Sequence, residues 1–162
     1  MNIQFHKFSE FPRGTIYKLL EDAYSCDDRW KQVFEENWLE SDKFFYDNLD
    51  IADKYGFVTT LDGEPIGHIS WDPRHQPEYV EIGHNCIATR YKGKGYGKMQ
   101  LQEAIRRIKT YEGLQKIIVT TNEKLTPAHF NYASVGMKLV QKRENHTEHA
   151  FSGDYMYYEI LL

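Results

Sequence analysis

The chain is poor in the residue types that define several whole classes of protein. It has only two cysteines in 162 residues, Cys26 and Cys86, and they lie far apart in unlike surroundings. Such a pair does not indicate a disulfide framework, so we expect two free thiols and a reducing, cytoplasmic setting. The sequence also lacks a long apolar run and a signal-peptide core near its start. We therefore predict no membrane partner.

Basic residues are also fewer than acidic ones. The chain has 20 Lys and Arg against 24 Asp and Glu, which gives a formal net charge of −4. General affinity for nucleic acid needs a basic surface, so we predict no nucleic-acid partner, whereas a cationic substrate is compatible with this balance. The sequence has no internal repeat and no low-complexity tract. Its length fits a single domain, residues 1–162, with one substantial core.

The hydrophobic patterning predicts an α+β fold that is mostly sheet. Asp62-Gly63 lies between two strand-like runs and predicts a hairpin. Thr126-Pro127 is typical of an N-cap followed by proline at the first helical position, and Gly113 and Gly136 are expected to end helices. We expect strands over residues 2–8, 56–61, 65–71, 79–88, 116–121, 137–142 and 155–162, and helices over 12–24, 27–38, 98–112 and 126–135.

A glycine-rich run separates the fourth expected strand from the clearest helix. It reads Lys92-Gly93-Lys94-Gly95-Tyr96-Gly97-Lys98. Alternating glycines leave backbone N–H groups uncovered by side chains, and the helix adds the positive end of its dipole at the same place. The run therefore predicts a site for a phosphate or pyrophosphate group.

Two well-known phosphate-binding motifs do not fit this run. A P-loop needs Ser or Thr after its Gly-Lys pair, but Gly97-Lys98 is followed by Met99, and Lys92 stands where an earlier glycine is required. A dinucleotide fingerprint needs the spacing G-x-G-x-x-G in a βαβ unit, whereas this run has G-x-G-x-G after an expected hairpin. The spacing therefore favours a phosphate-bearing ligand of another class, and a glycine-rich turn without a ligand stays open as the alternative.

The run resembles the acyl-CoA signature of the GNAT N-acetyltransferase superfamily, which is written Q/R-x-x-G-x-G/A. Lys92, Gly95 and Gly97 occupy the signature positions, with Lys92 in place of the usual Gln or Arg. Lysine meets a phosphate as a point charge and lacks the fork of arginine.

A second segment, Ala128 to Met137, resembles the later family pattern A-x-x-x-Y-x-x-x-G-F. Ala128, Tyr132 and Gly136 match in spacing, and Met137 replaces the phenylalanine. The resemblance covers roughly residues 58–139. It implies a mixed, mostly antiparallel twisted sheet flanked by about four helices, in one N-acetyltransferase-like domain.

The resemblance implies acetyl-CoA as co-substrate and transfer of the acetyl group to a primary amine by direct attack in a ternary complex. We expect no metal, because His146 and His149 have no further ligands at suitable spacing. It places pantetheine along one strand end and the oxyanion donor near Ile87. A covalent route through Cys86 is disfavoured, because a thiol in an apolar strand is usually a small buried residue. The implied acetyl-CoA contacts are Cys86, Ile87, Ala88, Lys92, Gly93, Lys94, Gly95, Tyr96, Gly97 and Lys98, the loop residues mainly through backbone N–H groups.

The resemblance also implies an acid and a base. Tyr132 is the expected acid that protonates the departing CoA thiolate, because a tyrosine hydroxyl is protonated at neutral pH. Glu81 is the expected base, acting directly or through a water. His84 stays open as an alternative base, on the opposite face of the strand by alternation.

The acceptor is the least determined part of the hypothesis. Aromatic and acidic residues concentrate over residues 30–47 and would suit a cationic small-molecule or peptide amine. An alternative is a non-catalytic acyl-CoA-binding regulatory module of the same fold. A free sheet edge would allow a homodimer, although no residue decides the oligomeric state.

Overall fold

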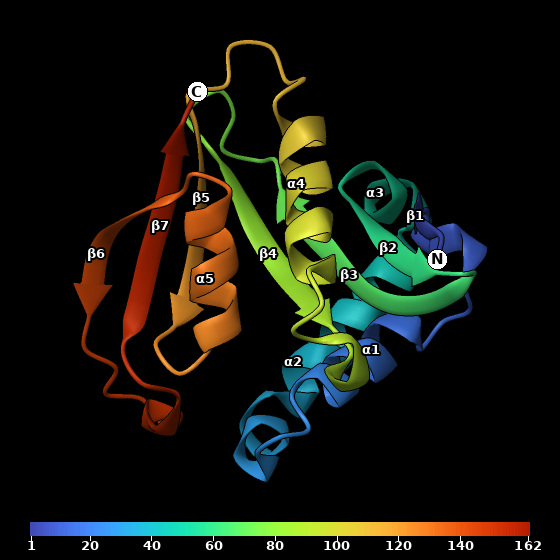
Figure 1. Cartoon of the computed structure of the whole chain (residues 1–162), viewed down its shortest axis with the longest axis horizontal. Helices are drawn as coiled ribbons and strands as arrows, with labels where there is room; N and C mark the ends of the chain where they lie inside the picture. Colours follow the sequence, from blue (N-terminus) through green and yellow to red (C-terminus); the bar gives the residue numbers. More distant parts are fainter. The chain divides into compact units, whose positions relative to one another are not determined.

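The computed structural model describes residues 1–162 and contains seven strands and five α-helices (Figure 1). The strands are β1 (Ile3–His6), β2 (Gly56–Leu61), β3 (Glu64–Asp72), β4 (Val80–Ile87), β5 (Lys116–Asn122), β6 (Lys138–Arg143) and β7 (Tyr155–Leu161). The α-helices are α1 (Thr15–Ala23), α2 (Asp28–Asp47), α3 (Leu49–Lys54), α4 (Tyr96–Ile108) and α5 (Thr126–Ser134).

Hydrogen bonds join the strands in the order β1-β2-β3-β4-β5-β7-β6. The pair β4–β5 is parallel, and the pairs β1–β2, β2–β3, β5–β7 and β6–β7 are antiparallel. The predicted fold class, α+β with a mixed and mostly antiparallel sheet, is therefore confirmed.

The chain divides into two compact units that are interleaved in the sequence. Unit 1 contains residues 1–70 and 84–97, and unit 2 contains residues 71–83 and 98–162. Strand β4 begins in unit 2 and ends in unit 1. The assignment of the chain to a single domain stays a prediction.

The hairpin of unit 1 forms as the sequence predicts. Asp62 and Gly63 have φ values of 50° and 86°, and Leu61 pairs with Glu64 across the turn. Positive φ at both central residues is the backbone of a tight two-residue hairpin turn, which Asp-Gly tolerates well.

The helices of unit 1 differ from the expected ones because a buried charge interrupts the hydrophobic pattern. Helix α2 continues to Asp47, beyond the expected end at 38, and the short α3 was not expected. Trp38, Asp42 and Tyr46 are all buried at helical spacing. The Asp42 carboxylate accepts hydrogen bonds from the backbone N–H groups of Gly14 and Tyr17 at 3.0–3.1 Å. Asp42 thus caps α1, whose own N-cap, Gly14, has no side chain.

Two helix ends of unit 2 also differ from the prediction. Helix α4 stops at Ile108. The N–H of Lys109 still bonds four residues back, but those of Thr110 and Tyr111 bond three residues back, so the final turn tightens before Gly113. Helix α5 has Leu125 as its N-cap, which makes Thr126 the first helical residue and moves Pro127 to the second position. Its end agrees with the sequence, because Gly136 follows the C-cap with φ of 95°.

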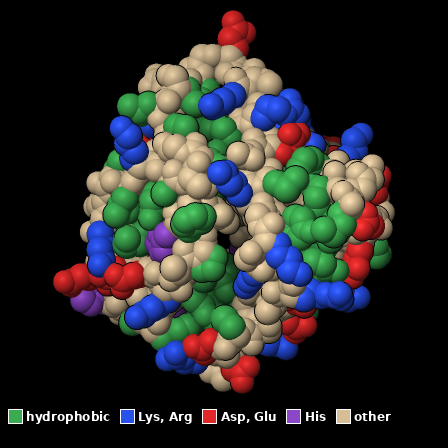
Figure 2. All heavy atoms as spheres, in the orientation of Figure 1, with side chains coloured by type: hydrophobic (Ala, Val, Ile, Leu, Met, Phe, Trp, Pro, Cys, Tyr) green, Lys and Arg blue, Asp and Glu red, His purple; other side chains and the backbone are tan.

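The surface carries mixed charge. Figure 2 shows Lys and Arg side chains at separate places on one face, with Asp and Glu side chains between some of them. No helix combines the length and the apolar character that a membrane crossing would need.

Candidate functional site

The glycine run forms an open loop that ends in the first turn of α4. Gly93 and Gly95 have φ values of 75° and 89°, and a Cβ added to either would meet no atom within 4 Å. Glycine is therefore required by the backbone conformation and not by crowding. The first N–H groups of α4, from Tyr96 to Lys98, have no partner within the helix. An exposed loop with these donors fits a phosphate group.

Two side chains of the loop, those of Lys92 and Tyr96, contact other parts of the protein. The Lys92 ammonium donates a hydrogen bond to the backbone carbonyl of Ala23, the last residue of α1. Lys94 is exposed, and Tyr96 is buried with its ring 6.4 Å from that of Tyr91. Besides the exposed Lys94 side chain, the loop therefore presents mainly its backbone to solvent.

The end of β4 has one backbone group that is well placed for a ligand. The N–H of Ala88 donates to the carbonyl of Ile66 at 2.7 Å, and the Ala88 carbonyl accepts from Tyr91 N–H at 2.9 Å. Successive N–H groups of an extended strand point to opposite sides. The N–H of Ile87 therefore points away from β3, in agreement with its predicted role as a donor to the oxyanion. The backbone groups of Ala88 are already hydrogen-bonded within the protein, so they fit a ligand contact less well.

The Cys86 thiol is not set up as a nucleophile. The side chain is buried, and burial raises the pKa of the thiol to about 12. Because the reactive form of cysteine is the thiolate, this environment opposes a covalent acyl-cysteine.

Glu81 lies in the part of β4 that belongs to unit 2. Its pKa is raised, first by burial of the carboxylate and second by the nearby negative charge of Asp72. Asp72 itself stays ionised, because its hydrogen bonds to Arg74 lower its pKa to about 2. A carboxylate with a raised pKa is a stronger base than an exposed one.

Tyr132 is buried on α5, with 4% of its surface exposed. Its ring lies 5.6 Å from the ring of Tyr158 on β7, and Figure 1 shows α5 in front of β5 and beside β7. Tyr158 pairs with Val119, and Val119 pairs with Ile82, so these three side chains share one face of the sheet. Glu81 precedes Ile82 and therefore lies on the opposite face from α5.

Sequence reasoning missed a histidine that fixes α5 on the sheet. His129 Nε2 lies 2.9 Å from the carbonyl of Asn122 and 3.1 Å from that of Glu123, and Nδ1 lies 2.8 Å from the Tyr158 hydroxyl. Carbonyls only accept, so Nε2 carries the hydrogen, and the Nδ1 of a neutral ring accepts from Tyr158. His129 and Tyr132 are three residues apart on one helix. That spacing was a usable signal, because such residues share a helix face.

His84, the alternative base, lies in unit 1. Its Nε2 shares a hydrogen bond of 3.0 Å with the Ser41 hydroxyl of α2, and its ring lies 6.5 Å from that of His68. Burial lowers the pKa of both histidines, that of His68 to about 3. Both rings are therefore neutral at neutral pH.

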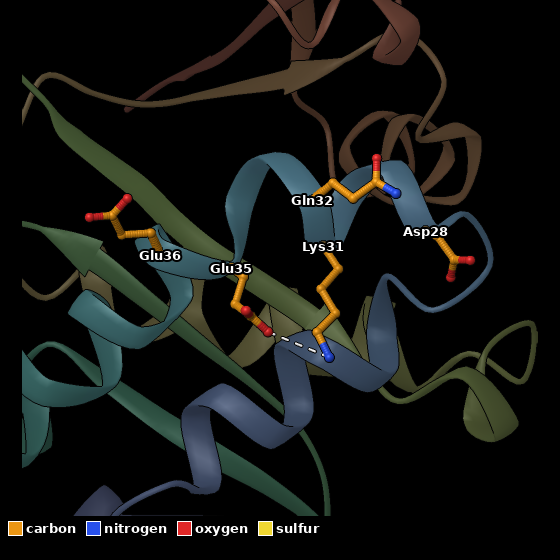
Figure 3. Close-up of a pocket in the computed structure, with 5 residues that line it drawn as sticks. All are labelled: Asp28, Lys31, Gln32, Glu35 and Glu36. Carbon is orange, nitrogen blue, oxygen red and sulfur yellow. Dashed lines mark ion pairs between the residues drawn. The ribbon is translucent and has the colours of Figure 1, made fainter.

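The aromatic and acidic residues of α2 have mostly structural partners. Trp30, Trp38 and Tyr46 are buried, and Tyr24 stacks on Trp38 with ring centroids 5.5 Å apart. Figure 3 shows the side chains of Asp28, Lys31, Gln32, Glu35 and Glu36, which line a hollow on α2.

One carboxylate of this hollow is already occupied. Glu35 accepts from the Tyr17 hydroxyl at 2.6 Å and pairs with Lys31 at 3.4 Å. The Glu35 hydrogen bond is the main reason that the pKa of Tyr17 rises to about 12. The structure thus gives these side chains packing and pairing roles within unit 1.

Comparison with known sequences identifies one family, and a curated relative is named as an acetyltransferase too. The profile of the Acetyltransferase (GNAT) family matches residues 15–137. A mycothiol acetyltransferase of Corynebacterium glutamicum (strain R) is 26% identical over 128 residues, which are 68% of this chain and 44% of that protein. The chain therefore spans less than half the length of this curated relative.

Two solved structures share the fold. A PaiA N-acetyltransferase from Thermoplasma acidophilum in complex with coenzyme A aligns with a TM-score of 0.72 at 18% identity, over 100% of both chains. A GNAT family acetyltransferase from Elizabethkingia anophelis with acetyl-CoA bound aligns with a TM-score of 0.66 at 18% identity, over 99% of this chain and 97% of the other.

Proposed function

The chain belongs to the acetyltransferase (GNAT) family, and from this premise we propose that it transfers an acetyl group from acetyl-CoA to a primary amine by direct attack. The observation that carries the proposal is the glycine loop, where Gly93 and Gly95 adopt positive φ in open space ahead of the α4 N-terminus. The pyrophosphate of the donor would be held there by backbone N–H groups, including those of Tyr96 and Gly97.

The acceptor nitrogen must lose a proton before it attacks. An alkyl ammonium has a pKa of about 10.4 and is a poor nucleophile while protonated. We assign the base to Glu81, because its pKa is raised by burial and by Asp72. The attacking nitrogen then bonds to the acetyl carbon, and the N–H of Ile87 is the proposed donor to the oxyanion.

Loss of CoA requires a proton for the sulfur as the carbon–sulfur bond breaks. We assign this proton to the Tyr132 hydroxyl. The new amide nitrogen releases its second proton to solvent, and the Tyr132 oxygen regains a proton from solvent, which closes the cycle. The base acts on the acceptor nitrogen and the acid acts on the sulfur. Because these are different atoms, Glu81 and Tyr132 can fill the two roles from opposite faces of the sheet. The raised pKa of Cys86 supports direct transfer over an acyl-cysteine.

The test is CoA release from acetyl-CoA, followed with a thiol reagent over a panel of small-molecule and peptide amines. We expect Tyr132→Phe to lower kcat about 100-fold while the donor Kd stays within about twofold. Tyr157→Phe is the matched control, since Tyr157 lies on β7 with Arg143 over its ring at 5.7 Å and has no proposed role.

Normal turnover by Tyr132→Phe would remove Tyr132 as the acid. Donor binding without turnover on any amine would favour a non-catalytic acyl-CoA-binding module.

A further inference from the structure

Lys92 occupies a position of the phosphate signature, but its ammonium is bound to another helix. Nζ donates to the carbonyl of Ala23, and Ala23 is the buried last residue of the nine-residue helix α1. The last carbonyls of a helix have no partner within it, and they form the negative end of its dipole. Lys92 thus satisfies and neutralises the C-terminus of α1.

A second set of hydrogen bonds joins the same helix end to the start of the loop. The N–H of Thr89 donates to Asp22 Oδ1 at 2.6 Å, and the Thr89 hydroxyl donates to the Asp22 carbonyl at 2.7 Å. Figure 1 shows the loop ahead of α4 lying over α1, in agreement with these contacts. The last two residues of α1 therefore hold both ends of the segment 89–92.

The held segment is itself one short turn. Lys92 N–H donates to the Thr89 carbonyl at 3.2 Å, and Tyr91 N–H donates to the Ala88 carbonyl at 2.9 Å. The next residue, Gly93, begins the exposed part of the loop with φ of 75°. Glycines have wide conformational freedom, so the open loop needs a fixed base if its N–H groups are to be ready for an anion.

We propose that Lys92 is a positioning residue, which together with Asp22 and Thr89 clamps the base of the phosphate-binding loop to α1. In this proposal Lys92 improves donor binding by holding the loop, and its ammonium acts on the carbonyl of Ala23 rather than on the phosphate. The inference rests on the proposed function for its consequence, tighter donor binding. The clamp itself is a property of the ligand-free protein.

The first experiment therefore uses no ligand. Amide hydrogen exchange is measured over residues 86–95 and over the end of α1, in the full chain. We expect Lys92→Met to speed exchange at Thr89 and Tyr91 about tenfold, and Lys92→Arg to restore protection. Lys94→Met is the matched control, because it removes the same charge from the same exposed loop and should leave exchange at Thr89 unchanged.

A second pair of variants tests the other half of the clamp. Thr89→Val removes the hydroxyl at nearly constant shape, whereas Thr89→Ser keeps it. We expect Thr89→Val to speed exchange at Lys92 severalfold and Thr89→Ser to leave it close to wild type. Unchanged exchange over residues 89–92 in both Lys92→Met and Thr89→Val would overturn the proposal.

The consequence for the donor is measured as the Kd for CoA by calorimetry. We expect Lys92→Met and Asp22→Ala each to weaken binding about fivefold, and the double variant to weaken it by clearly less than the product, because both break one clamp. Multiplicative effects would mean that Lys92 acts on the phosphate directly and would overturn the positioning role. If wild type binds no CoA, the proposed function fails, while the exchange experiment still decides whether the clamp exists.

Discussion

The glycine loop of unit 1 and helix α5 of unit 2 offer a ligand two different kinds of group. The loop presents backbone N–H groups in an exposed segment, and Gly93 and Gly95 have open space around them. Helix α5 holds one side chain, Tyr132, in a buried setting beside Tyr158. In the proposed function, donor binding therefore depends on the local backbone conformation of the loop, whereas the proposed proton transfer depends on neighbours that other elements supply to Tyr132.

The largest expected effect concerns the side-chain chemistry. We expect Glu81→Gln to lower kcat/KM about 100-fold or more, because the amide cannot take a proton from the acceptor. Glu78→Gln, a change of the same kind in an exposed loop residue, should have little effect. An equal loss in both variants would remove Glu81 as the base.

The pH profile sharpens the same assignment. The negative charge of Asp72 helps to raise the pKa of Glu81, so Asp72→Asn should lower that pKa. A base works only when deprotonated, and the acidic limb of kcat/KM should therefore move to lower pH in Asp72→Asn. An acidic limb that stays in place would indicate that another group, such as His84, is titrating.

Acid should distinguish the stabilities of the two units. Burial holds the pKa of His68 at about 3 in the folded protein, whereas the unfolded value is 6.5. Between these values the unfolded chain binds more protons, so stability falls as the pH falls from 6.5 towards 3, by a total on the order of 5 kcal/mol for this group. His84, whose pKa is also lowered by burial, adds to the effect in the same direction.

Hydrogen exchange of individual amides at pH 7 and pH 5 measures this difference. We expect the protection of unit 1 strands β2 and β3 to fall more than that of β5 and β7. Equal losses in both units would contradict the assignment of acid sensitivity to the buried histidines of unit 1.

A backbone change should weaken the loop by a smaller amount. Gly95→Ala forces a Cβ into a left-handed conformation at a cost of about 1–2 kcal/mol, which corresponds to about a tenfold weaker Kd for CoA if the loop leaves its binding conformation. Gly113→Ala introduces the same kind of strain at φ of 73° outside the loop. It should lower the unfolding free energy without changing the Kd, and equal Kd values for the two variants would argue against the loop as the phosphate site.

The smallest effect tests the support of α5. We expect His129→Ala to lower the free energy of unfolding by about 1–2 kcal/mol, because the Tyr158 hydroxyl loses its partner. Tyr158→Phe removes the same hydrogen bond from its other side, and the double variant should be less than additive in a urea titration. Additive losses would show that the two side chains act independently.

The sequence by itself determined the features that depend on local backbone chemistry. The Asp62-Gly63 turn, the positive φ at Gly136 and the open glycine loop follow from residue types that tolerate unusual conformations. The hydrophobic patterning of the sequence was also enough to predict the α+β fold class.

Only the tertiary structure decided where the charged side chains act. Asp42 turned out to cap α1 across unit 1, Lys92 to bind the end of α1, and His129 to hold Tyr158. These contacts join residues that are separated by 28, 69 and 29 positions in the chain. Tertiary packing decides which polar groups meet across such sequence separations, and the hydrophobic periodicity of the sequence does not predict these partners.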